Sequence, residues 1–169
     1  MKIKFLTTGG TIDKIYFDAK SEFEVGPPQV SELLHDANVT FEHQVESILR
    51  KDSLEMTDTD RAFIRERVVA DPAAHIIVTH GTDTMIQTAL ALKGIPGKTI
   101  VLTGSMQPAR LRVTDAGFNL GAAVVAVQTL PPGVYLAMNG RIFSPDRSRK
   151  NVAGHCFEEI VSAVRTPAR

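Results

Sequence analysis

Short polar turns rich in threonine and glycine occur at three places in the sequence, and each follows a run of apolar residues. The turns are residues 8–11, 79–82 and 103–105. Their glycines leave backbone N–H groups free to form an anion cradle or an oxyanion hole. The hydroxyls of Thr11 and Thr82 are candidate nucleophiles if a base takes the proton, and Tyr16, Asp83 or a distant lysine could supply that base.

Each of these features also has a purely structural interpretation. A Thr-Gly-Gly-Thr turn by itself is more often only a turn, and the sequence lacks both the Gly-x-Gly-x-x-Gly fingerprint and the Gly-Lys-Ser/Thr of a phosphate-binding loop. The five histidines have no metal-ligand spacing, so we expect no metal and interpret His80 as a core histidine bonded to backbone. Cys156 is interpreted as a packing residue.

Composition places the chain among ordinary globular proteins. Of its 169 residues 43% are hydrophobic and 22% charged, which predicts a single domain over residues 1–169. Lysine plus arginine and aspartate plus glutamate both number 19, so a nucleic-acid partner is not expected. One cysteine, a short N-terminal apolar run and no segment of about 20 apolar residues favour a cytoplasmic protein without a membrane partner.

Strand-like and helix-like segments alternate along the chain, which predicts a parallel sheet with helices on both faces. Strands are expected at residues 3–8, 39–48, 75–79, 99–103 and 134–138. Helices are expected at residues 27–35, 57–70, 82–92 and 114–130. The predicted fold class is therefore α/β, a three-layer αβα arrangement of the Rossmann or flavodoxin-like type. Because parallel strands end at one edge of the sheet, the three turns should converge on one crevice.

Several local features complete this prediction. Residues 15–26 show no clear period and are expected to form a loop, and residues 52–56 form a second loop at a strand end. Asn139-Gly140 is a hairpin signal that predicts an antiparallel strand over residues 141–143 and hence a C-terminal β-hairpin. Residues 156–164 fit a last strand, although a helix fits nearly as well.

Two helices carry more specific predictions. The second helix should begin at a cap formed by Thr57 or Asp58 and place Phe63, Ile64 and Val68 on its inner side. The last helix, rich in alanine, is expected to be well buried.

The motifs taken together are far more specific than any one of them. The segment Thr8-Gly9-Gly10-Thr11-Ile12 and the later His80-Gly81-Thr82-Asp83-Thr84-Met85 resemble the two signature motifs of the bacterial-type L-asparaginase family. The turn at residues 104–108 and the helix start at 115–120 also resemble that family, so the resemblance covers residues 1 to about 150. It implies hydrolysis of the side-chain amide of asparagine, sometimes also of glutamine, without a cofactor or metal.

The resemblance also implies roles for individual residues. Thr11 would be the nucleophile, activated by a tyrosine of the following loop. Tyr16 can fill that role, although Phe23 stands where many members have the tyrosine. A second triad would consist of the Thr82-Asp83 pair and Lys150, which accepts a proton.

Substrate-binding roles follow from the same resemblance. Asp83 would bind the α-ammonium group of the substrate and Ser53 its α-carboxylate. The expected substrate-binding residues are Gly10, Asp52, Ser53, Gly81, Thr82, Asp83 and Ser105. Leu54 occupies a position where the long enzymes commonly have glutamine, which removes one polar contact to the substrate.

The chain is about half as long as is usual in this family. It therefore resembles a short, single-domain member without the smaller C-terminal domain, and a homo-oligomer, dimer or tetramer, is expected. Two other functions stay open from the sequence: an ω-amidase that prefers glutamine or another amide, and a non-catalytic amino-acid-binding domain. A fragment of a longer chain also remains an alternative.

Overall fold

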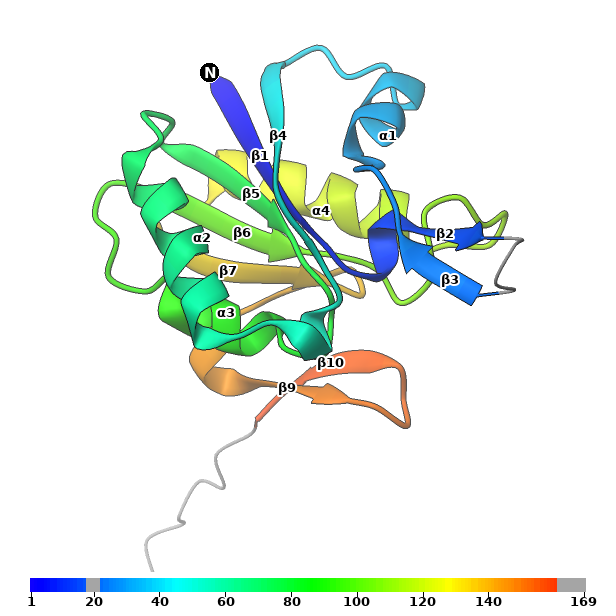
Figure 1. The fold of residues 1–169 in the computed structure, drawn as a ribbon. Helices are drawn as coiled ribbons and strands as arrows, with labels where there is room; N and C mark the ends of the chain where they lie inside the picture. The colour runs from blue at the N-terminus through cyan, green and yellow to red at the C-terminus, as the bar shows by residue number, and fades with distance from the viewer. Residues whose placement is uncertain (18–21, 161–169) are drawn as a thin grey trace, which may run out of the picture.

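The fold is built on a six-stranded sheet, seen in a computed structural model that describes residues 1–17 and 22–160 (Figure 1). Its strands are β1 (Lys2–Gly9), β4 (Glu42–Lys51), β5 (His75–Thr79), β6 (Thr99–Thr103), β7 (Gly133–Met138) and β8 (Arg141–Phe143). They lie in the order β4-β1-β5-β6-β7-β8, and all neighbours are parallel except β7 and β8. This confirms the predicted mostly parallel α/β fold and the antiparallel pairing after Asn139-Gly140.

Helices cover both faces of the sheet, as predicted. They are α1 (Val30–Asp36), α2 (Asp58–Ala70), α3 (Met85–Ala91) and α4 (Ala116–Thr129). In Figure 1, α2 and α3 lie in front of the sheet and α4 lies behind it. Strand β5 shows why the sheet has two cores: Ile76 and Val78 pack with α2 and α3, whereas Ile77 packs with α1 and α4.

The sheet order determines where a ligand can bind. Strand β1 lies between β4 and β5, so the chain crosses from one side of β1 to the other after β4. In such flavodoxin-like sheets the crevice lies at the carboxyl ends of the strands flanking this crossover. Because β1, β5 and β6 are neighbours, the three polar turns that follow them do converge, as predicted.

The prediction of a loop at residues 15–26 was wrong. Strands β2 (Lys14–Phe17) and β3 (Glu22–Val25) form an antiparallel hairpin, with Tyr16 opposite Phe23. The two rings meet at an angle of 65° with centroids 5.5 Å apart. A strand of four residues is too short to show a clear alternation, and cross-strand aromatic pairs of this kind stabilise a hairpin only once the two strands have met.

Three element boundaries also differ from the prediction. Strand β4 begins three residues later than the predicted strand at residues 39–48, because its pairing with β1 begins at Glu42 opposite Lys2. Helix α1 begins at Val30, after the two prolines rather than within them. Helix α3 begins at Met85, since the Thr82-Asp83 pair belongs to the preceding loop.

Helix α2 begins as predicted but buries a different set of residues. Thr57 caps it through a full capping box with Asp60, whose carboxylate accepts from the Thr57 N–H at 2.8 Å. Ile64 and Val68, one turn apart, are fully buried. Phe63 is 38% exposed, so its predicted place on the inner side was wrong.

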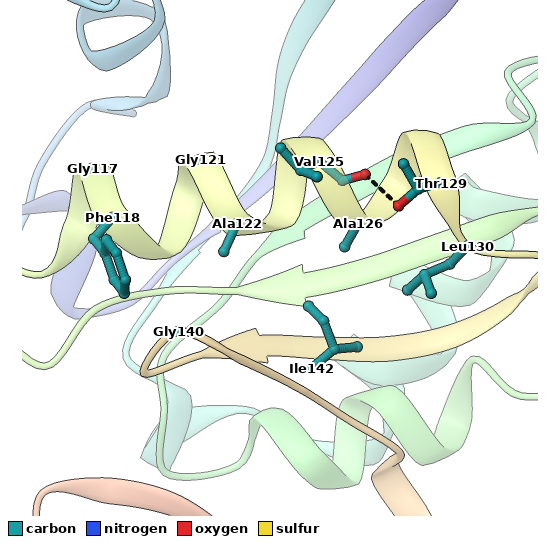
Figure 2. Close-up of a pocket in the computed structure, with 10 residues that line it drawn as sticks. All are labelled: Gly117, Phe118, Gly121, Ala122, Val125, Ala126, Thr129, Leu130, Gly140 and Ile142. Atoms are coloured by element: carbon teal, nitrogen blue, oxygen red, sulfur yellow. Dashed lines mark hydrogen bonds between the residues drawn. The ribbon is translucent and has the colours of Figure 1, made fainter.

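Helix α4 is only half buried, which contradicts the prediction of a well-buried helix. One face carries Phe118 and Val125, which are 68% and 60% exposed. With the β7–β8 turn and strand β8 this face borders an apolar groove of about 670 Å³ (Figure 2). Its lining residues are Gly117, Phe118, Gly121, Ala122, Val125, Ala126, Thr129, Leu130, Gly140 and Ile142. Within residues 1–17 and 22–160, no helix combines the length and apolar character that a membrane span needs.

A second hairpin at the C-terminal end was not predicted in full. Strand β9 (Ser148–Asn151) was missed, and it pairs antiparallel with β10 (Cys156–Glu159). The strand alternative for residue 156 onward is thus confirmed as far as Glu159, while residues 161–164 lie outside the described part. Phe157 anchors the hairpin because it is buried in the same core as Phe143.

Candidate active site

Glycines allow the strand-end turns to touch one another. A Cβ on Gly10 would lie 2.4 Å from the Gly81 nitrogen, and a Cβ on Gly81 would lie 2.5 Å from the Cβ of Ser53. Gly10 also has a φ of 86°, which L side chains rarely adopt. Because Thr11 and Thr82 each directly follow one of these contacting glycines, the two candidate hydroxyl residues lie on adjacent backbone segments.

Lys150 reaches the second of these turns from strand β9. Its ammonium donates to the Thr82 hydroxyl at 2.7 Å and contacts the Asp83 carboxylate at 2.6 Å. Lys150 is held in place because its register partner is the buried Phe157, whose N–H donates to the Asn139 side chain at 2.9 Å. The structure therefore brings together the three residues that the resemblance placed in one triad.

His80 supports this turn and is a core residue, as predicted from the sequence. It is fully buried between the Gly81 carbonyl, 2.8 Å from Nδ1, and the Thr88 hydroxyl, 2.8 Å from Nε2. Burial lowers the pKa of His80 to about 4, so the ring is neutral at pH 7. Since a carbonyl can only accept, Nδ1 carries the proton and Nε2 accepts from Thr88.

Ser53 lies against the crossing of the two glycine turns. Its hydroxyl is buried and has no hydrogen-bond partner among the residues that the structure describes. Its backbone carbonyl accepts from the Thr84 hydroxyl at 2.7 Å, which ties this loop to the turn after β5. A buried hydroxyl without a partner is costly, and a substrate oxygen would satisfy it. Leu54, the next residue, is 75% exposed.

Asp52 stands beside Ser53 but is already engaged. Its carboxylate forms an ion pair with Lys14 at 2.7 Å and accepts from the Leu54 N–H at 3.1 Å. Burial acts to raise the pKa of Asp52, but these two hydrogen bonds and the charges of Lys14 and Lys150 outweigh it and lower the pKa below its ordinary value. Lys14 was not singled out from the sequence, where only its position after the first motif marked it.

Tyr16 lies on the hairpin that follows Thr11. Its side chain is 53% exposed and rests against Phe23, the other residue that the resemblance placed at the activating position. The two alternatives left open by the sequence are therefore neighbours across one hairpin, on the same face.

Asp13 closes the base of this hairpin and was also missed from the sequence. Its backbone carbonyl accepts from the Gly26 N–H at 2.8 Å, and its carboxylate accepts from the Gln29 N–H at 2.9 Å. The side chain is almost fully buried. Burial raises the pKa of Asp13 to about 6, although the Gln29 N–H and the charge of Arg50 act in the opposite direction. A lone carboxylate after an apolar residue carries no sequence signal for such burial.

Ser105 is buried at the end of β6, but its hydroxyl is directed into its own turn. It donates to the Gln107 carbonyl at 2.6 Å. The same turn is fixed by Asp115, which accepts from the N–H groups of Met106 and Gln107 at 3.0 Å. These bonds give Ser105 a structural task next to the crevice.

The chemical character of the crevice follows from these groups. It contains the Thr82 hydroxyl, an ammonium group bridging that hydroxyl and the Asp83 carboxylate, and the backbone of the glycine turn that leads into Thr11. A lysine in its neutral form can take a hydroxyl proton, and N–H groups can stabilise a developing oxyanion. Among the described residues no group of histidine, cysteine, aspartate and glutamate side chains is arranged to hold a metal ion.

Comparison with known proteins assigns this arrangement to a family. Residues 2–162 match the family described as Asparaginase, N-terminal. The chain belongs to the asparaginase family. Among its curated relatives are an L-asparaginase of Thermococcus kodakarensis, 32% identical over 89% of this chain, and a glutaminase-asparaginase of Acinetobacter glutaminasificans, 33% identical over 82%. Another relative, a component of the glutamyl-tRNA(Gln) amidotransferase of Methanococcus vannielii, is 29% identical over 83%.

Solved structures agree with this assignment. The thermostable L-asparaginase from Thermococcus kodakarensis superposes with a TM-score of 0.82 at 29% identity, covering 100% of this chain and 57% of that one. The chain spans 48% of the curated Thermococcus relative, 43% of the Acinetobacter relative and 34% of the Methanococcus relative. It therefore corresponds to the N-terminal part of an asparaginase.

Proposed function

We propose that this asparaginase-family chain is an amidohydrolase that converts L-asparagine to L-aspartate and ammonia. The observation that carries the proposal is the contact of Lys150 with both Thr82 and Asp83, directly beside the glycine turn that holds Thr11. The hydroxyl between this lysine and the glycine turn can relay a proton to or from a group attacking at Thr11.

In the proposed reaction, the Thr11 hydroxyl attacks the side-chain carbonyl carbon and gives up its proton to a base. Backbone N–H groups of the glycine turns stabilise the oxyanion, and ammonia leaves when the C–N bond breaks and the amide nitrogen takes up the proton that Thr11 gave up. Water then attacks the acyl carbon of the Thr11 ester and gives a proton through the Thr82 hydroxyl to the neutral form of Lys150. The ester bond breaks, the proton returns to the Thr11 oxygen, and aspartate is released. Asp83 binds the α-ammonium group, and the Ser53 hydroxyl receives the α-carboxylate.

The names of the relatives point to different amide substrates. One relative's name includes glutaminase and another's refers to an amidotransferase for glutamyl-tRNA(Gln). Glutamine is therefore the second candidate substrate. Comparing kcat/KM for asparagine and glutamine decides between them, because one extra methylene in the pocket is worth about 1–3 kcal/mol.

The first prediction tests the nucleophile. Thr11→Ala should reduce ammonia release from asparagine by at least about a thousand-fold, since removing a hydroxyl nucleophile removes the covalent route. Lys150→Met should also lose most activity, because Thr82 then has no proton acceptor. Ammonia is measured in a coupled assay on folded protein.

Matched variants control for the substitutions themselves. Thr40→Ala, exposed before the start of β4, and Lys93→Met, just after the end of α3, should keep full activity. Full activity of Thr11→Ala would refute the proposed nucleophile. Saturable binding of asparagine to the unmodified chain without any turnover would instead favour the non-catalytic amino-acid-binding function.

The proposal includes a cytoplasmic homo-oligomer, dimer or tetramer, acting on a small molecule. The support for self-association is the uncharged outer face of α4 with its exposed Phe118 and Val125. Sedimentation equilibrium tests the oligomeric state directly.

A further inference from the structure

Lys14 connects two parts of the chain that the sequence places far apart. It is the first residue of β2, and its ammonium lies 2.7 Å from the carboxylate of Asp52, which precedes Ser53. Both side chains are about three-quarters buried. The ion pair is thus a direct link between the β2–β3 hairpin and the loop that holds Ser53, whose hydroxyl has no partner within residues 1–17 and 22–160.

The pleat of the hairpin shows which of its side chains share the face of Lys14. Side chains two apart in a strand point the same way, so Tyr16 follows Lys14 on that face. Their register partners Phe23 and Val25 lie on it as well. Val25 is close to the first glycine turn, because a Cβ on Gly9 would lie 2.9 Å from its Cγ1. The face with Lys14 and Tyr16 is therefore the face toward the crevice.

Asp13 holds the base of the hairpin. Asp13 fixes the point where the chain enters and leaves, through Gly26 and Gln29. A side-chain ion pair to a separate loop limits the tilt of a hairpin more than bonds at its own entry and exit do. Lys14 supplies such a contact from the first residue of β2, two residues before Tyr16.

We propose that Lys14 is a positioning residue whose ion pair with Asp52 fastens the β2–β3 hairpin to the Ser53 loop and thereby sets the place of Tyr16 at the site. In this arrangement Asp52 binds Lys14 and not the substrate. This replaces the role of substrate ligand that was expected for Asp52 from the sequence. This inference rests on the proposed amidohydrolase function and deepens it.

The test is a double-mutant cycle with kinetics. Lys14→Met and Asp52→Asn should each lower kcat about ten-fold, because a misplaced activating group slows the chemical step, and should change KM by less than about three-fold. The double variant should fall no further than either single variant, since both remove the same contact. Lys14→Arg, which keeps the charge, should retain at least half of kcat. Lys93→Met, which breaks the exposed ion pair with Asp146 outside the hairpin and the Ser53 loop, should leave both constants unchanged.

A second measurement is independent of turnover. Hydrogen exchange of the amides at residues 14–17 and 22–25 should become faster in Lys14→Met and Asp52→Asn but not in Lys93→Met. If no amide is turned over by the unmodified chain, the proposed function fails, and exchange alone decides whether the ion pair fastens the hairpin.

Three results would overturn the inference. The first is unchanged exchange in the Lys14 and Asp52 variants. The second is faster hydrogen exchange in these variants while kcat stays unchanged in an active enzyme. The ion pair would then hold the hairpin in place without positioning Tyr16 for the reaction. The third is a raised KM with an unchanged kcat in Asp52→Asn alone, which would mark Asp52 as a substrate ligand.

Discussion

Individual side chains at the crevice separate into those that can react and those that hold them. Lys150 donates a hydrogen bond to the Thr82 hydroxyl and also contacts the Asp83 carboxylate. His80 is neutral and uses both ring nitrogens on the turn and its helix, so its place in the second motif is architectural. A motif residue next to the reacting group thus need not take part in the chemistry.

The pairing of Tyr16 with Phe23 leads to a prediction about where the activating hydroxyl can sit. Tyr16→Phe removes the only phenol from this pair and should lower kcat at least about a hundred-fold, within the usual contribution of proton transfer. The exchange Tyr16→Phe with Phe23→Tyr moves the hydroxyl across the hairpin and should recover part of kcat, because the two rings are register partners. Steady-state ammonia release measures both.

Controls for this exchange are available in the same hairpin. Phe23→Tyr alone should keep kcat within about three-fold, since it adds a hydroxyl without removing one. Full activity of Tyr16→Phe would show that neither ring activates Thr11.

At the level of elements, the site depends on how closely the loops can approach. The turns after β1, β4 and β5 meet at Gly10, Ser53 and Gly81 with no space for an added carbon on either glycine. Strands only bring these turns to one edge of the sheet. The turns can touch because Gly10 and Gly81, where they meet, have no side chains.

Glycine replacements should therefore have opposite effects at the crossing and on α4. Gly10→Ala places a methyl group against the Gly81 backbone at a positive φ and should destabilise the protein by at least about 2 kcal/mol. Gly121→Ala, in the interior of helix α4, meets nothing within 4 Å among the described residues and should stabilise by about 0.5–1 kcal/mol. Urea denaturation gives both values, and equal effects of the two changes would contradict the steric account.

For the molecule as a whole, the buried Asp13 makes folding stability depend on pH. Its pKa is about 6 in the folded protein and 3.8 in an ordinary setting, so the folded state holds the proton more tightly. This contribution is fully present below pH 3.8 and is lost as the pH rises through 6. The shift corresponds to roughly 3 kcal/mol of stability that is present at low pH and absent at pH 8.

Asp13→Asn should remove this dependence, because asparagine keeps an acceptor for the Gln29 N–H but cannot ionise. The free energy of unfolding of the variant minus that of the unmodified chain should rise by about 2–3 kcal/mol between pH 4 and pH 8. Urea titrations at a series of pH values measure it. Contributions of His80 and of other groups are common to both proteins and cancel. A difference that stays constant with pH would contradict the buried, proton-holding state of Asp13.

Much of this architecture follows from local sequence patterns. Apolar runs such as residues 76–78 are long and regular enough to mark buried strands, and Thr57 marks the start of α2 through its capping box. Asn139-Gly140 predicts its own turn because few other residues adopt the required positive φ, here 53° and 73°. Lys150 was found only through the family resemblance, since nothing local links it to a turn 68 residues earlier.

By itself, the sequence determined the α/β class, the family motifs and the residue types of the crevice, because periodicity, capping and glycine turns act over a few residues. Only the tertiary structure decided that residues 14–17 and 22–25 pair as a hairpin, that Lys14 pairs with Asp52 and that Asp13 is buried. Those outcomes depend on contacts between segments that meet only after the sheet has formed. Their energies arise from burial and charge pairing in the folded molecule, which no local pattern encodes.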